Sequence, residues 1–90
     1  MVIKGLAVEI VEDMIELHKD LYPFDLTDDD YEDLVFPMEL ENLMANPHGV
    51  IESLENEIKE LKLDGDYFKK QIKLAESIIA KIKMIERRKQ

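Results

Sequence analysis

The sequence contains no cysteine and no tryptophan, and it has only three glycines and three prolines in 90 residues. Without cysteine the chain forms neither disulfides nor thiolate metal sites, so helix packing or assembly with other chains has to stabilise it. Long apolar runs are also missing, and acidic residues interrupt the N-terminal stretch MVIKGLAVEIVEDM before a signal-like segment is complete. We therefore expect a soluble, cytoplasmic protein that makes no contact with a membrane.

The composition is typical of a helical protein. Hydrophobic residues make up 46% of the chain and charged residues 37%, and the long stretches between the few glycines and prolines use Glu, Lys, Leu, Ile and Met. These residues are good helix formers. We predict an all-α fold of three to four helices in one small domain over 1–90, with acidic N-terminal helices in 1–45 and a helical hairpin or coiled coil in 46–90.

Two helical regions are predicted in the N-terminal half. Apolar residues recur at three- and four-residue spacing from Leu6 to Tyr22, where Pro23 ends the helix. Thr27 and the acids after it indicate a second start, because the hydroxyl can accept a backbone N–H and the acids favour the positive end of the helix dipole. Pro37 predicts a kink, so we expect a bent helix or two short ones from 28 to 45.

A third helix is predicted to begin at Asn46-Pro47, where the asparagine caps and proline is tolerated at the first helical position. Apolar residues then alternate by three and four from Ile51 to Ile82. The alternation passes through Asp64-Gly65-Asp66 without a change of phase, which is compatible with one continuous coiled-coil arm.

The same triplet also predicts a turn. A continuous helix would carry a cost of roughly 2 kcal/mol there relative to alanine. Gly65 can instead end one helix in the left-handed conformation, and Asp66 can cap the next. Both structures remain open, and the hairpin is favoured because folding back at Gly65 brings opposite charges together, Glu60 beside Lys70 and Glu57 beside Lys73.

The three-four alternation is the predicted interaction surface. We predict a non-enzymatic protein–protein interaction module that self-associates, with a dimer favoured, through this seam. The seam consists of Ile51, Leu54, Ile58, Leu61, Phe68, Ile72, Ile79 and Ile82.

Charge is polarised along the chain. Residues 1–57 contain 16 acidic and 2 basic side chains, and residues 58–90 contain 5 acidic and 10 basic ones, giving the net charge of −9. An alternative prediction is therefore an acidic inhibitor that mimics nucleic acid and contacts a nucleic-acid-processing protein through Asp28, Asp29, Asp30, Glu32 and Asp33. A basic tail ends the chain, but so small a patch on an acidic protein does not indicate nucleic-acid binding; it consists of Lys81, Lys83, Arg87, Arg88 and Lys89.

A further alternative is enzymatic. Glu12-Asp13-Met14-Ile15-Glu16 is followed after 13 residues by Asp30-Tyr31-Glu32-Asp33. Over about 22 residues this pattern resembles two motifs of the all-α nucleotide pyrophosphohydrolases. The resemblance implies carboxylates from two helices that hold Mg²⁺ against a triphosphate.

Two departures weaken that resemblance. Asp30 stands where the family has Glu, and Glu12 and Glu16 fall on the helix face assigned to solvent. The sequence contains no nucleophile motif, no phosphate-binding loop and no cofactor fingerprint. The leading prediction therefore includes neither a metal nor a cofactor.

Overall fold

The computed structural model of the protein describes residues 2–23 and 26–89, and side chains within 5–23 and 26–87. These residues contain helices and no strand, which confirms the all-α prediction. None of the helices in this described part is both long and apolar enough to cross a bilayer. The elements are α1 (Val2–Leu21), α2 (Asp28–Asp30), the π-helical turn η1 (Tyr31–Val35), α3 (Phe36–Ala45), α4 (Pro47–Lys62) and α5 (Lys69–Lys89).

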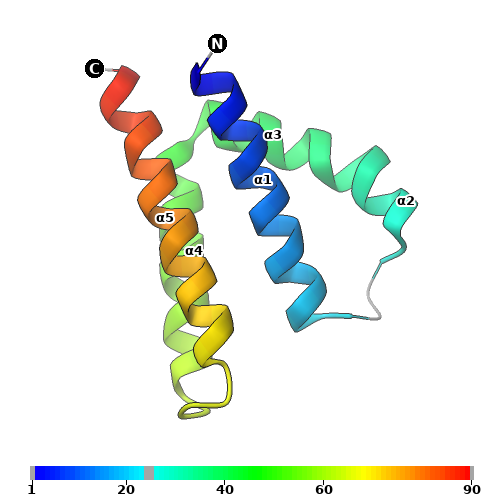
Figure 1. Ribbon diagram of the computed structural model, residues 1–90, viewed down its shortest axis with the longest axis vertical. Coiled ribbons are helices and arrows are strands. Elements are labelled where there is room, and N and C mark those ends of the chain that lie inside the picture. The colour runs from blue at the N-terminus through cyan, green and yellow to red at the C-terminus, as the bar shows by residue number, and fades with distance from the viewer. Residues whose placement is uncertain (1, 24–25, 90) are drawn as a thin grey trace.

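Helix α5 is the element that both α1 and α4 pack against (Figure 1). α1 and α4 run in the same general direction, and α5 runs in the opposite direction. α1 therefore begins, and α5 ends, at the same end of the molecule. α3 crosses this layer and packs mainly on α1. α1 and α4 pack extensively on α5 but little on each other, which leaves one side of the bundle open.

The core forms on the wide apolar face of α5. Fully burying one such side chain contributes about 1.5–3 kcal/mol to folding. One helix cannot cover this face, so α1 and α4 share it. The buried residues that make up the core are Ala75, Ile78, Ile79, Ile82 and Ile85 of α5 with Ala7, Ile10, Val11 and Leu17 of α1, Leu43 of α3, and Ile51, Leu54 and Ile58 of α4.

The turn over residues 63–68 confirms the hairpin and excludes the continuous helix. Gly65 has a φ of 68°, the left-handed conformation that glycine adopts without a steric cost. Its N–H donates to the carbonyl of Lys62 at 3.1 Å, which satisfies one of the last acceptors of α4.

The predicted charge pairs across the hairpin are wrong. Within the described residues, neither Glu60 with Lys70 nor Glu57 with Lys73 forms an ion pair. Glu57 accepts a hydrogen bond from the Tyr22 hydroxyl instead, and Glu60, Lys70 and Lys73 are exposed to solvent.

The segment from Asp28 to Ala45 is helical throughout, with its irregularity placed before Pro37. The Phe36 N–H donates to the carbonyl of Tyr31, five residues back, as in a π-helix. In a regular α-helix Pro37 would leave a carbonyl unpaired and clash with the preceding turn. The predicted kink therefore takes the form of a widened turn. Thr27 caps the start, as predicted.

Lys81 ties α5 to α1. Its ammonium donates to Asp13 Oδ2 at 2.8 Å and to Glu9 Oε1 at 2.9 Å. The hydrogen bond to Asp13, then the one to Glu9, raises the pKa of Lys81 above its ordinary value of 10.5. The side chain is 27% exposed, so solvent only partly screens these bonds.

Replacing Gly65 by alanine tests the turn. The new Cβ meets no atom within 4 Å, so the change acts through the backbone alone. A non-glycine residue in the left-handed region costs about 1–2 kcal/mol, and the free energy of unfolding in urea should fall by that amount. The matched control is Gly5→Ala, inside α1, which should raise stability by about 0.5–1 kcal/mol. If Gly65→Ala stabilised the protein as well, the chain would have to be helical through this triplet.

The Lys81 bonds predict a specific pH dependence. Because the pKa of Lys81 is higher in the folded than in the unfolded chain, its contribution is complete below 10.5 and is lost as the pH rises through the folded value. The stability difference between the parent and Lys81→Met should therefore shrink in urea unfolding curves above pH 10.5. Lys83→Met, which removes an exposed lysine from the same helix, should show no such trend. A difference that stays constant with pH would contradict the assigned role of Lys81.

Candidate functional site

The seam predicted for self-association lies inside the folded chain. Six of its residues are buried between the helices, and Phe68 and Ile72 are half-buried. Apart from Leu54, which also lines the groove described below, a second chain could reach the buried side chains only if the hairpin opened. Self-association through this seam stays a prediction.

The predicted acidic surface is placed at the start of the α2–η1–α3 segment. Asp28, Asp29, Glu32 and Asp33 are exposed, while Asp30 is half-buried and its carboxylate accepts the N–H of Thr27 at 3.3 Å. Asp28 also forms an ion pair of 3.0 Å with Lys19. Part of this charge therefore serves the local structure, and the inhibitor role stays a prediction.

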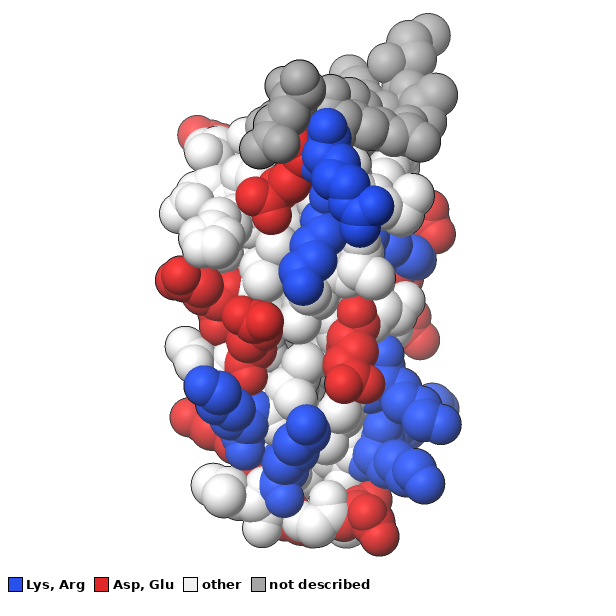
Figure 2. Space-filling model, turned by 90° about the vertical axis from the view of Figure 1, so that its left-hand side faces the viewer, with Lys and Arg blue, Asp and Glu red and all other residues white. Residues whose placement is uncertain are grey.

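The described side chains of the basic tail do not form one continuous surface. Lys81 is turned towards α1, whereas Lys83 and Arg87 are exposed; the side chains of Arg88 and Lys89 lie outside the described ones. Figure 2 shows the face at the left of Figure 1, where basic side chains gather in separate groups towards the two ends and acidic ones lie between them.

The carboxylates implied by the pyrophosphohydrolase resemblance face different neighbours. Asp13 lies against α5 and binds Lys81, and Asp30 takes part in the cap at Thr27. Glu12, Glu16 and Glu32 line a hollow between α1 and the α2–η1–α3 segment. Nowhere in the described residues do three carboxylates or histidines lie close enough together to hold a metal ion. The two-helix Mg²⁺ site that the resemblance implies is therefore not assembled.

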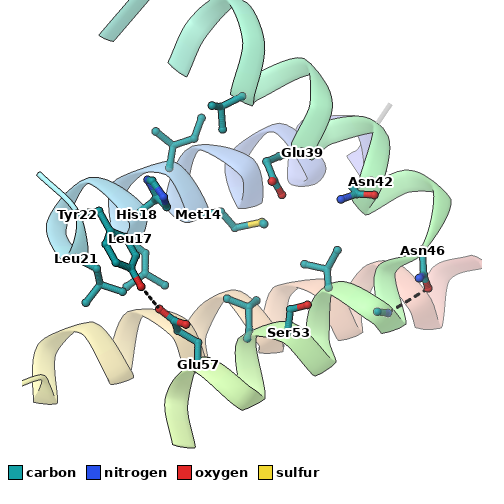
Figure 3. A pocket seen from close by; sticks show the side chains of 15 residues that line it. Met14, Leu17, His18, Leu21, Tyr22, Glu39, Asn42, Asn46, Ser53 and Glu57 are labelled. Carbon is teal, nitrogen blue, oxygen red and sulfur yellow. Dashed lines mark hydrogen bonds between the residues drawn. The ribbon is translucent and has the colours of Figure 1, made fainter. Parts of the chain in front are cut away.

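A groove lies on the open side of the bundle, between α1, α3 and α4 (Figure 3). Its volume is about 500 Å³, and it opens to solvent. Apolar side chains from α1, α4 and η1 form its floor and lower walls: Met14, Ile15, Leu17 and Leu21 from α1, Val50 and Leu54 from α4, and Val35 from the end of η1.

Polar side chains form the rim of the groove. Figure 3 shows Glu39 and Asn42 pointing into it from α3, and Ser53 and Glu57 on the α4 side. Asn46 joins the two walls, and its Oδ1 accepts the N–H of Gly49 at 3.1 Å. None of the lining residues is Lys or Arg.

The far end of the groove is bordered by α1. The Tyr22 hydroxyl donates to Glu57 Oε1 at 3.4 Å, which links the end of α1 to α4. His18 lies beside Tyr22, with ring centroids 5.0 Å apart. The groove thus has a defined end on each side, Asn46 at the α3–α4 junction and the Tyr22–Glu57 contact at the other.

Contacts between α1 and η1 hold the α3 wall in place. A hydrogen bond of 2.6 Å joins His18 Nδ1 to the hydroxyl of Tyr31, which is buried. The Lys19 ammonium lies 4.9 Å from the centre of the Tyr31 ring, a cation–π arrangement. Lys19 also reaches Asp28, so α1 contacts both α2 and the first residue of η1.

Comparisons of the chain with protein-family models, with curated proteins and with solved structures found no match. The chemistry of the groove is therefore the basis for a functional proposal.

Sequence reasoning missed the groove because its residues belong to three helices whose mutual arrangement the sequence does not specify. One signal was present. The apolar stripe of α1 is broader than a single partner helix requires, since Met14, Ile15 and Leu21 extend it beyond the buried residues that face α5. These additional side chains form the floor of the groove.

Proposed function

We propose that the protein is a non-enzymatic protein-interaction module that binds a helical segment of a partner chain in the α1–α3–α4 groove. The observation that carries this proposal is an open groove with an apolar floor and a polar rim. Such a surface suits the apolar face of an amphipathic helix, whose side chains at three- and four-residue spacing enter the groove while its polar face stays in solvent.

The surrounding structure favours a helical occupant. The described residues form no sheet, so no strand edge is available there for an extended peptide to join. The three walls are themselves helices, and a further helix laid between α3 and α4 would complete the open side of the bundle by ordinary helix packing.

The distribution of the acids supports an interaction role over the enzymatic alternative. The carboxylates of Glu39 and Glu57 come from opposite walls of the groove, and those of the pyrophosphohydrolase resemblance face away from it. Acids spread in this way suit contact with a partner along a length of helix better than they suit chemistry at one point.

Filling the groove tests the proposal. A phage-displayed library of amphipathic helical peptides would be selected on the parent protein, and the enriched peptides would then be titrated against Ser53→Trp. Ser53 lies in the groove and is exposed, so the indole should fill the space without disturbing the core. The peptides should bind this variant at least about tenfold more weakly, a loss of about 1.4 kcal/mol.

The matched control is Ser77→Trp, which places the same side chain on the exposed face of α5, outside the groove lining. It should bind the peptides as the parent does, and circular dichroism should show both variants folded. Enriched peptides that bind Ser53→Trp as tightly as the parent, or the absence of any enriched peptide, would contradict the proposal.

A further inference from the structure

The charges around the groove specify the chemistry of its occupant. We infer that the partner is a different protein whose helix carries Lys or Arg on both flanks of its apolar stripe; this inference rests on the proposed function.

The α3 and α4 walls of the groove each contribute one half-buried carboxylate. Glu39 projects from α3 and Glu57 lies on α4, on the other side of the apolar floor. A helix that lies with its apolar stripe on this floor presents one polar flank to each wall. A basic residue on each flank would therefore meet a carboxylate, whereas an acidic one would meet a like charge with no Lys or Arg in the lining to compensate.

Glu57 can accept such a partner without losing its present contact. The bond from the Tyr22 hydroxyl is long, at 3.4 Å, and uses one of the two carboxylate oxygens. An incoming ammonium or guanidinium would add a hydrogen bond in which donor and acceptor are both charged, whereas in the bond from Tyr22 only the acceptor is.

The net charge of the residues that form the groove also favours a basic partner. All three walls belong to residues 2–62, and the first 57 residues carry 16 acidic and only 2 basic side chains. One of these two, Lys19, is already paired with Asp28. The resulting negative potential attracts a basic helix and speeds its association, while it repels an acidic one.

Among the described residues, a second copy of the chain offers no suitable helix. The exposed apolar pair Leu34 and Met38 is flanked by Asp33 and Glu41, so it would bring acids to an acidic groove. The exposed Leu63 and Tyr67 lie in the turn and not on a helix. The basic helix α5 already uses its apolar face in the core, and Met84 is the one large hydrophobic residue exposed on its described part. The chemistry of the groove thus points to a partner of a different sequence.

Three synthetic helical peptides of about 18 residues, long enough to form a helix on binding, test the inference. They share one apolar stripe and differ in their flanks: Lys on both sides, Lys on one side with Gln on the other, and Glu on both. Isothermal titration at low salt should give a Kd for the doubly basic peptide about tenfold lower than for the doubly acidic one. The Kd of the peptide with Lys on one side should lie between these two values, and the differences in Kd should become smaller as salt is added.

Charge reversal in the protein is the reciprocal test. Glu39→Lys and Glu57→Lys should each weaken binding of the doubly basic peptide, and the double variant should prefer the doubly acidic one. The controls are Glu41→Lys and Glu55→Lys, which make the same change on exposed positions of α3 and α4 outside the groove lining. They alter the net charge equally and should change the Kd much less.

The possible failures are distinguishable. Equal binding of basic and acidic peptides, both blocked by Ser53→Trp, would keep the groove as a binding site and overturn the charge inference. Equal binding of the one-sided and doubly basic peptides would overturn the requirement for two flanks. No binding of any peptide would count against the proposed function itself. A dimer of the unmodified protein that dissociates on Ser53→Trp, seen by light scattering, would identify a second copy as the occupant and overturn the inference.

Discussion

The structure depends on the wide apolar face of α5, which is too broad for one partner helix to cover. Ile78, Ile82 and Ile85 are fully buried because α1 and α4 share that face. The turn at Gly65 brings α4 and α5 together, and Lys81 holds α5 against α1 through two carboxylates. Because the chain has no cysteine to form disulfides, burial around this one helix is its main source of stability.

The groove follows from the same constraint. Because α1 and α4 both pack on α5, they make little contact with each other, and their remaining apolar side chains face the open side of the bundle. α3 borders this side without filling it, since the His18–Tyr31 contact holds its leading turn on α1 and the Asn46 cap fixes its junction with α4. The groove is therefore an opening between three fixed helices, which is how helix bundles commonly form binding sites.

The sequence predicted what local patterns encode. Asn46-Pro47 and Thr27 marked helix starts correctly, and Gly65 marked the turn, because capping and left-handed backbone depend on residues near in sequence. For the widened turn before Pro37 the sequence predicted only a kink, since the form of the turn depends on where the chain packs on α1. The heptad phase did not decide between a seam within one chain and a seam between chains, because both have the same spacing. The groove depends on how three helices are arranged, and single-sequence patterns do not fix that arrangement.

Charge connects the groove with its proposed role as a binding site for a basic helix. The most direct measurement is isotope-filtered NMR of the protein in complex with the doubly basic peptide, read as NOEs between peptide and protein side chains. The account predicts NOEs from the apolar stripe of the peptide to Met14, Val50 and Leu54, on the floor of the groove. NOEs to the exposed Leu34 and Met38 instead, with none to the groove floor, would contradict it.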